Sequence, residues 1–392
     1  MIDIVILSAT RTPIGAFQGA LASVPASRLG AAAIRGAVAQ AGVNPHDITD
    51  CLMGNVLQAG QGQAPARQAA LYAGLPTSVR CVTVHKVCGS GMQTVMGVSH
   101  FLSGGLGSIA VAGGMENMSL APYLLPKARD GYRLGHQQVI DSLITDGLWD
   151  PYNNLHMGNC AEQCAAKYHF SREQQDAYAI ESFQRANAAQ KAGLLAAEIT
   201  PVEITDAKGN VTKVEHDEGP AKVKYDKIPS LKPSFQKDGT ITPANASSIN
   251  DGAAALVLST ADTALQRGLR PLARIVAFGS HAQDPVWFTT APVQAAQSAL
   301  KAAGWSVADV DLWEVNEAFA VVPMAFMQEL GVPRDKLNVR GGAIALGHPI
   351  GASGARILVT LLAALKERGK KRGVAAICIG GGEGLAVCLE LP

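Results

Sequence analysis

Short runs of hydrophobic residues alternate along the chain with longer stretches in which apolar positions recur every three or four residues. The runs of strand length include residues 4–7, 108–112 and 374–379. Residues 93–102 and 171–192 have the apolar spacing of helices, and the second of these stretches begins at a capping-box pattern formed by Ser171 and Gln174. Strands that alternate with helices predict an α/β protein with mainly parallel strand pairing.

The chain resembles itself at an offset of about 262 residues, which indicates an internal duplication. Residues 39–42 correspond to residues 301–304, and the glycine turn at 89–91 corresponds to the turn at 351–354. Each half is predicted to contain a strand, a helix, a strand, a glycine turn, a helix and a strand. We expect the two halves to pack face to face as one duplicated body.

The duplication divides the chain into three parts. The predicted first half comprises residues 1–118 and 246–270, and the second half comprises residues 271–392. Residues 119–245 interrupt the first half as an inserted loop domain, which contains the helical stretch at 171–192 and a polar part with several prolines.

The composition is that of a folded protein with a large core. Hydrophobic residues make up 48% of the 392 residues, charged residues make up 17%, and the formal net charge is +1. No apolar run is long enough to span a bilayer, and the strand pattern beginning at Ile4 leaves no room for a signal peptide. We therefore expect a cytoplasmic protein that binds neither nucleic acid nor a membrane surface.

One basic segment departs from this balance. It contains Lys222, Lys224, Lys227, Lys232 and Lys237. Such a cluster is either a solvated surface loop or a binding region for an anionic ligand.

Cysteines are the first candidates for chemistry. They lie at positions 51, 81, 88, 160, 164, 378 and 388, without the spacings of a zinc site or a C-x-x-C motif, so we expect reduced thiols and no metal. Cys88 stands at a glycine turn before the predicted helix at 93–102, where the positive helix end would lower the pKa of the thiol. Alternatively, Cys88 is a buried structural thiol, and Cys160 and Cys164 pack on one helical face.

Three other segments carry residues suited to catalysis. They are residues 315–319 with Asn316, residues 341–351 with His348, and residues 378–382 with Cys378 and Gly380. A histidine can take the proton of a cysteine that attacks a carbonyl carbon, a second cysteine can exchange a proton at carbon, and glycine N–H groups can form an oxyanion hole. Alternatively, Asn316 caps a helix beginning near Glu317, Cys378 belongs to the core, and the glycines allow tight packing.

Taken together, these four segments are similar, in the same order, to the motif set of the thiolase family. Residues 115–119, 156–158 and 245–247 extend the similarity over essentially the whole chain, which most resembles the biosynthetic members, the acetyl-CoA acetyltransferases. The resemblance implies the thiolase fold, a five-layered αβαβα body whose inserted loop domain covers the coenzyme A site.

The resemblance also implies a role for each motif residue. Cys88 would be acylated, His348 would activate it, and Cys378 would exchange the proton at the α-carbon. The N–H groups of Cys88 and Gly380 would bind the thioester oxyanion, while His348 and a water held by Asn316 would stabilise the enolate. The residues that would line the coenzyme A and acyl channel are His156, Met157, Ser247, Ala318 and Phe319.

The implied reaction is the reversible Claisen condensation of two acetyl-CoA molecules to acetoacetyl-CoA and CoA, with ping-pong kinetics and no cofactor beyond the coenzyme A thioesters. A 3-ketoacyl-CoA thiolase of broader or longer chain length is an alternative, and a non-catalytic acyl-CoA-binding relative is a more distant one. A cysteine protease would leave Cys378 unexplained. By resemblance the protein is a homotetramer, with dimers formed through the sheet edges of the first half and joined by a loop near residues 120–140.

Several positions depart from the family pattern. Pro220 and Lys227 stand where relatives often have an arginine and a serine near coenzyme A, so we expect Lys222, Lys224 or Lys227 to attract the phosphates instead. Phe288 replaces a methionine near the acyl end. Glu383 follows the turn after Cys378, where it either perturbs that thiol or faces water.

Overall fold

The computed structural model describes residues 2–206 and 208–392, and its main feature is a ten-stranded sheet. The strands of the first half are β1 (Ile4–Arg11), β3 (Ile48–Gly54), β4 (Arg80–Val84), β5 (Ile109–Asn117) and β12 (Asn250–Thr260), with the short β2 (Gly15–Ala16) beside β12. Those of the second half are β13 (Ala273–Ala282), β14 (Leu312–Val315), β15 (Arg372–Ile379) and β16 (Glu383–Glu390).

The strand order confirms the duplication. The first half has the order β1-β12-β5-β3-β4, and the second half has the equivalent order β13-β16-β15-β14. The two sheets are joined edge to edge where Ile4, Val5 and Ile6 of β1 pair with β13 in antiparallel register, a contact that the sequence pattern did not predict.

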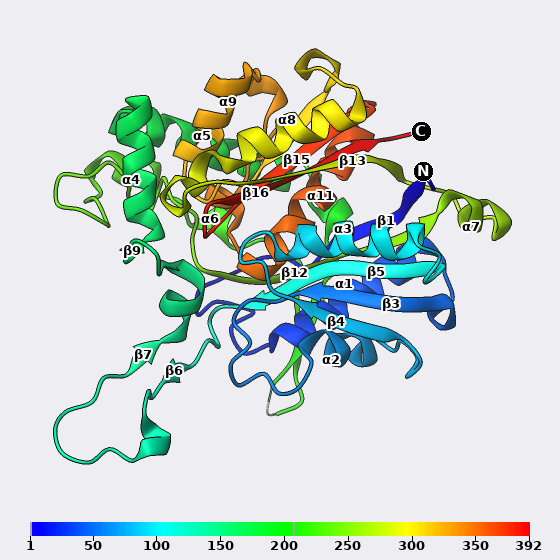
Figure 1. Ribbon diagram of the computed structural model, residues 1–392, viewed down its shortest axis with the longest axis horizontal. Coiled ribbons are helices and arrows are strands. Elements are labelled where there is room, and N and C mark those ends of the chain that lie inside the picture. The colour runs from blue at the N-terminus through cyan, green and yellow to red at the C-terminus, as the bar shows by residue number, and fades with distance from the viewer. Residues whose placement is uncertain (1, 207) are drawn as a thin grey trace.

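The helices complete a body of five layers (Figure 1). Those of the first half are α1 (Ala26–Ala41), α2 (Pro65–Tyr72) and α3 (Ser90–Ser103), and those of the second half are α8 (Ala291–Ala303), α9 (Val321–Leu330) and α11 (Ile350–Glu367). The α1 and α2 helices cover the outer face of the first sheet, α8 and α9 cover the outer face of the second, and α3 and α11 pack together between the sheets. The expected αβαβα fold is confirmed.

Burial on both sides explains the sequence of α11. Of its 18 residues, 15 are buried, so it is apolar around almost its whole circumference, as expected for a helix enclosed by two sheets. Its N-terminus carries the second glycine turn and follows directly after His348 and Pro349.

The expectation of mainly parallel pairing is wrong. Among the strand pairs of the described sheet, only β3–β4, β3–β5 and β14–β15 are parallel, whereas β12 and β16 pair antiparallel with both of their neighbours. The reason is the connection at the end of each half. The β15 and β16 strands are joined by a short glycine turn at 380–382, which fits only an antiparallel pair, and β12 occupies the equivalent place in the first half.

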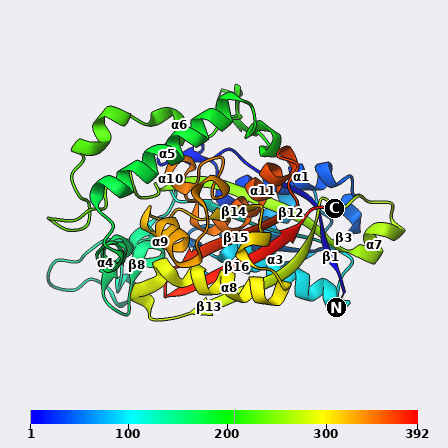
Figure 2. The ribbon, with the colours of Figure 1, turned by 90° about the horizontal axis from the view of Figure 1, so that it is seen from above.

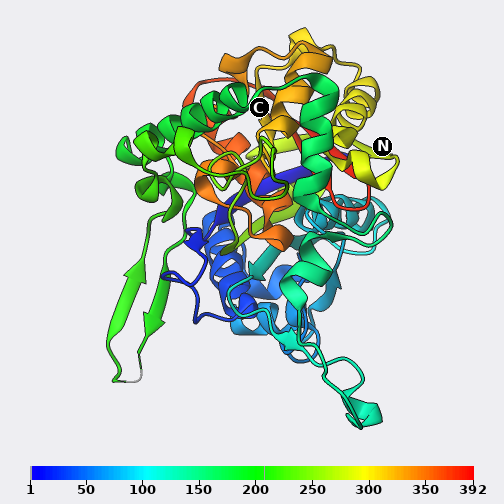
Figure 3. The same cartoon turned by 90° about the vertical axis from the view of Figure 1, so that its left-hand side faces the viewer.

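The segment between β5 and β12 lies along one side of the body (Figure 2). It contains α4 (Met157–Tyr168), α5 (Arg172–Lys191), the hairpin β10–β11 (Val202–Thr205 and Val211–Val214) and α6 (Gly219–Lys222). The predicted capping box is confirmed, because the Ser171 hydroxyl accepts a hydrogen bond from the Gln174 N–H and the Gln174 side chain accepts one from the Ser171 N–H. The hairpin and the segment between β6 (Tyr123–Leu124) and β7 (Ile140–Asp141) project from the body (Figure 3).

Buried ion pairs fasten this segment to the first sheet. The guanidinium of Arg11 on β1 is fully buried, donates to both carboxylate oxygens of Asp217 at 2.7 and 2.8 Å, and donates to Glu198 at 2.8 Å. Because each of these buried charges has a charged partner, the pairing offsets part of the cost of burying them within the apolar body.

Candidate active site

The loop between β4 and α3 presents Cys88. Val87 has a φ of 43°, which is strained for a β-branched residue and costs about 1–3 kcal/mol. Ser90 holds this conformation, because its hydroxyl donates to the Val87 carbonyl at 2.7 Å and accepts from the Lys86 N–H at 2.8 Å. The thiol of Cys88 is thereby fixed just before the first turn of α3.

The two glycine turns predicted as counterparts lie against each other. A Cβ atom at Gly354 would lie 2.4 Å from the backbone nitrogen of Met92, and one at Gly91 would lie 2.8 Å from that of Ala355. Since Cβ atoms do not approach so closely, only glycine lets the N-terminal ends of α3 and α11 meet. This contact brings the Cys88 loop and the His348 loop to one place.

Hydrogen bonds fix the position and the tautomer of His348. The backbone N–H of His348 donates to the Asn250 side chain at 2.9 Å. The Nδ1 atom of its ring lies 2.6 Å from the Ser353 hydroxyl, and that hydroxyl donates to the Pro349 carbonyl at 2.9 Å. The single hydroxyl proton is thus used, so Ser353 accepts from Nδ1–H and the Nε2 atom carries no proton. The amide nitrogen of Asn316 faces Nε2 at 3.5 Å.

The alternative that Asn316 caps a helix is wrong. The α9 helix begins at Val321 with Ala320 at its N-cap position, while Asn316 is fully buried immediately after β14. Among the described residues, its Oδ1 atom has no hydrogen-bond partner. Asn316 therefore presents an amide donor toward His348 and a free acceptor.

A cavity of about 260 Å³ unites most of the predicted site. The predicted residues that line it are Cys88, His156, Met157, Ser247, Phe288, Ala318, Phe319, His348 and Gly380. Much of its wall is aromatic, since Phe319 makes edge contacts with Phe288 at 6.3 Å and with Phe235 at 6.1 Å between ring centroids. Phe235 also stacks on His156 at 4.7 Å; it lies in a polar stretch of the chain, and no sequence signal singled it out.

Cys378 is fully buried near the end of β15, within electrostatic range of Cys88. Burial raises the pKa of the Cys378 thiol well above its usual value, and the nearby Cys88 raises it further. A thiol with a high pKa gives a thiolate that is a strong base, as proton removal from carbon requires.

The expected lowering of the Cys88 pKa does not occur. Burial raises this pKa to about 11, and the N–H groups of Gly380 and of Cys88 itself offset the effect only in part. Burial, together with the neighbouring guanidinium of Arg356, lowers the pKa of His348 to about 3. At neutral pH the resting pair is therefore an uncharged thiol beside an uncharged imidazole.

Two buried carboxylates, those of Glu116 and Glu317, organise the loops around the site. The sequence pattern did not single them out. Glu116 accepts hydrogen bonds from the N–H of Gly351 at 2.9 Å and from three donors in residues 55–57, and burial raises its pKa to about 7. Glu317 accepts from Tyr178, Ser182 and Asn338 at 2.7–2.8 Å. Both residues lie within the motif segments named above. The sequence signal that could have identified them is an acidic residue among apolar neighbours.

The three lysines expected near coenzyme A do not line the cavity. Lys222 ends α6 and pairs with Glu218 at 3.1 Å, and Lys227 lies 3.9 Å from Asp226. Both side chains are more than half exposed, and Lys224 is also placed outside the cavity wall. Their suggested contact with phosphates remains a prediction.

Two further sequence alternatives are decided by the structure. Glu383 forms an ion pair with Lys86 and its side chain is 39% exposed, which favours the interpretation that it faces water. Cys160 and Cys164 are fully buried in an apolar cluster on α4, so the packing interpretation is confirmed.

A metal site and a membrane-spanning helix are both absent from the described part of the chain. Within residues 2–206 and 208–392, no group of three or more histidine, cysteine or acidic side chains is arranged to hold a metal ion. Nor does any helix in the described ranges have the length and apolar character needed to cross a membrane.

Comparison with known proteins places this site in a family. The thiolase N-terminal domain matches residues 4–262, and the thiolase C-terminal domain matches residues 269–391. The chain therefore belongs to the thiolase family, as its motifs predicted.

Its relatives include acetyl-CoA acetyltransferase 2 of Arabidopsis thaliana, which is 51% identical over 391 residues and covers 99% of this chain and 97% of its own. The acetyl-CoA acetyltransferase of Cupriavidus necator is 50% identical over 391 residues, with 100% of both chains covered. The crystal structure of the Bacillus anthracis acetyl-CoA acetyltransferase, 40% identical, superposes with a TM-score of 0.97 and covers 100% of this chain and 99% of its own.

Proposed function

We propose that the protein is an acetyl-CoA C-acetyltransferase, which reversibly condenses two acetyl-CoA molecules to acetoacetyl-CoA and CoA. The observation that carries this proposal is the apolar cavity lined by Cys88, His348 and Gly380, with the buried Cys378 close enough for Cys88 to influence its pKa. Two thiols and one imidazole gathered at one cavity suit acyl transfer followed by carbon–carbon bond formation.

The first half-reaction transfers an acetyl group to the enzyme. The Nε2 atom of His348 takes the thiol proton of Cys88 as the sulfur attacks the thioester carbon. The N–H groups of Cys88 and Gly380 stabilise the oxyanion. CoA then leaves with a proton from Cys378, which becomes a thiolate.

The second half-reaction forms the carbon–carbon bond. The Cys378 thiolate removes an α-proton from a second acetyl-CoA, and the enolate oxygen is stabilised by protonated His348 and a water held by Asn316. The enolate attacks acetyl-Cys88, acetoacetyl-CoA forms, and the departing Cys88 thiolate recovers its proton from His348. The protons balance without a metal or a redox cofactor.

Mass spectrometry of the protein incubated with acetyl-CoA tests the proposal. We expect one acetyl group on Cys88 in the wild type and none in Cys88→Ser. The Cys378→Ala variant should still accept acetyl, more slowly, but should fail to exchange the α-protons of acetyl-CoA with deuterium. A wild-type protein that takes up no acetyl group would instead indicate a non-catalytic acyl-CoA-binding protein.

We propose a preference for short acyl chains, which the small cavity and the buried ring of Phe288 support. Thiolysis of acetoacetyl-CoA should therefore exceed thiolysis of 3-ketooctanoyl-CoA, and the reverse result would favour a 3-ketoacyl-CoA thiolase of longer chain length.

We further propose that Lys222, Lys224 or Lys227 attracts the coenzyme A phosphates. The Lys222/Lys224/Lys227 triple alanine variant should then have a raised KM for CoA at low salt. An unchanged KM would remove these lysines from the site.

We also infer a cytoplasmic homotetramer. The projecting segment at 120–140 exposes large apolar side chains, with Tyr123 66%, Leu125 56% and Leu134 100% exposed, as expected of a surface that is covered by other subunits. Sedimentation analysis should give a tetramer for the wild type and a smaller species for a Leu125→Asp/Leu134→Asp variant. A wild-type dimer would overturn this arrangement.

A further inference from the structure

The carboxylate of Glu116 is fully buried near the end of β5, and the proposed reaction does not use it. Its Oε1 atom accepts from the Asn55 side chain at 2.8 Å and from the Leu57 N–H at 3.1 Å. Its Oε2 atom accepts from the Val56 N–H at 3.0 Å and from the Gly351 N–H at 2.9 Å. All four partners are donors, so the arrangement suits an ionised carboxylate, which accepts hydrogen bonds and donates none.

These hydrogen bonds join the two halves of the molecule. Residues 55–57 follow β3 of the first half, whereas Gly351 lies in the first turn of α11 in the second half, three residues after His348. A Cβ atom at Gly351 would lie 2.6 Å from the Glu116 carboxylate, so only glycine permits this approach. The carboxylate also lies at the positive end of α11, which favours a negative charge there.

The groups that Glu116 holds belong to the apolar surface behind Cys88. This surface is a buried cluster against which the Cys88 side chain packs, and it consists of Val56, Leu57, Met118, Leu143 and Ile350. Glu116 binds the backbone of two of these residues and the N–H that follows a third. It therefore fixes the surface that sets the position of the thiol.

The charge of Glu116 acts on the same thiol. Burial raises the pKa of the Cys88 thiol most, and the negative charge of Glu116 raises it further. A carboxylate that only satisfied loop N–H groups would stabilise the fold without altering the reactivity of Cys88. The two roles therefore predict different results for the thiol.

We propose that Glu116 is a positioning residue for Cys88, which it holds at the junction of the two halves through residues 55–57 and the start of α11. It contacts neither the substrate nor the reacting atoms in this role. Its effect on turnover rests on the proposed acetyl transfer, whereas its effect on the thiol itself does not.

Two variants separate position from charge. Glu116→Asp keeps the charge but is too short to reach residues 55–57 and Gly351 together, and Glu116→Gln keeps the length but loses the charge and one acceptor. We expect kcat for acetoacetyl-CoA thiolysis to fall by about 10- to 100-fold in both, with little change in KM. At pH 8, iodoacetamide should modify Cys88 about 3- to 10-fold faster in Glu116→Gln, but no faster than wild type in Glu116→Asp.

Glu162→Gln is the control for a purely structural effect. Glu162 on α4 is another buried carboxylate, and it accepts from the N–H groups of Thr240 at 2.9 Å and Ile241 at 2.8 Å. Its substitution should lower the free energy of unfolding and leave the alkylation rate of Cys88 unchanged. The proposal is overturned if the Glu116 variants keep wild-type kcat, or if Glu116→Gln changes the alkylation rate no more than Glu162→Gln does.

Hydrogen exchange in the wild-type protein tests the same contacts without a variant. The amides of Val56, Leu57 and Gly351 should be protected, although residues 55–57 lie outside the helices and strands, because each is bound to a buried carboxylate. Rapid exchange at these amides would overturn the proposal. A wild type that takes up no acetyl group, but shows the expected exchange and alkylation, would support this role and overturn only the proposed function.

Discussion

Burial raises the pKa of the Cys88 thiol more than the N–H groups around it lower that pKa. Its pKa is raised to about 11, because two N–H groups replace only part of the water that a thiolate would otherwise bind. The thiolate must therefore form during the reaction, when His348 takes the proton and the substrate occupies the cavity. Such a neutral resting site protects the nucleophile from unrelated electrophiles.

Alkylation kinetics test this neutral resting state. Because the Cys88 pKa lies far above neutrality, the rate of Cys88 modification by iodoacetamide in the free protein should keep rising between pH 7 and pH 10. Modified Cys88 is quantified by peptide mass spectrometry. A plateau already reached near pH 7 would show that a thiolate–imidazolium pair exists before substrate binds.

Ser353 is expected to act as a positioning residue through the tautomer of His348. In Ser353→Ala, the acceptor 2.6 Å from Nδ1 is lost, so the imidazole can place its proton on Nε2 and fail to accept the one from Cys88. We expect kcat to fall by about 10- to 100-fold with little change in KM. Ser99→Ala removes a comparable buried hydroxyl from α3 and should leave kcat unchanged. Equal kcat values for both variants would contradict this role.

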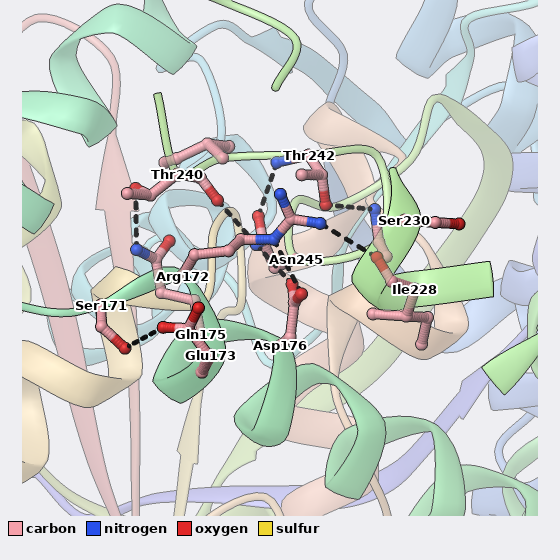
Figure 4. Close-up of polar contacts among 12 residues, drawn as sticks. Ser171, Arg172, Glu173, Gln175, Asp176, Ile228, Ser230, Thr240, Thr242 and Asn245 are labelled. Carbon is pink, nitrogen blue, oxygen red and sulfur yellow. Dashed lines mark hydrogen bonds and ion pairs between the residues drawn. The ribbon is translucent and has the colours of Figure 1, made fainter. Parts of the chain in front are cut away.

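At the scale of elements, the inserted segment builds one wall of the cavity. The carboxylate of Asp176 on α5 accepts from Arg172 at 2.7 Å and from Asn245 at 2.9 Å, as Figure 4 shows. Two residues beyond Asn245, the N–H of Ser247 donates to the Ala318 carbonyl at 2.9 Å. The start of α5 thus fixes the segment that lines the cavity.

The Asp176→Ala variant tests this connection. It leaves the Arg172 guanidinium without its charged partner and the Asn245 amide with one acceptor fewer, so the free energy of unfolding should fall by about 1–3 kcal/mol. The KM for acetyl-CoA should rise as Ser247 loses its fixed position. Chemical denaturation and steady-state kinetics measure the two effects. Glu173→Gln, a neighbouring change at an exposed position, is the control and should alter neither.

At the scale of the whole molecule, the site exists because two duplicated halves meet at their glycine turns. Cys88 belongs to the first half, while His348 and Cys378 belong to the second, so a complete site requires both. The packing of α3 on α11 sets the separation of these groups.

The Gly354→Ala variant tests how closely the halves must approach. Its Cβ would lie 2.4 Å from the Met92 nitrogen, which cannot move aside within a buried helix, so α3 and α11 must separate. We expect a loss of about 1–3 kcal/mol in unfolding free energy together with a marked fall in kcat. Gly97→Ala, also on α3, meets only the end of the Leu52 side chain at 3.2 Å and should retain both properties. Retention of activity by Gly354→Ala would show that the spacing is not critical.

Much of the fold and the site could be predicted from the sequence because these features are local or repeated. Glycine turns recur at a fixed offset, the capping box at Ser171 lies within four residues, and Cys88, His348 and Cys378 stand in recognisable motifs. Ser353, Asn250 and Glu116 were not identified as partners of the site, because each acts through a contact with a residue distant in sequence or one helical turn away.

The sequence by itself determined the strands and helices, the duplication, the family and the identity of the reactive groups, since these depend on residue type and spacing. Only the tertiary structure decided the antiparallel places of β12 and β16, the joining of the two sheets through β1 and β13, and the protonation states at the site. Strand pairing depends on how distant segments meet, and the pKa values of Cys88 and His348 depend on how completely the assembled layers exclude water from them.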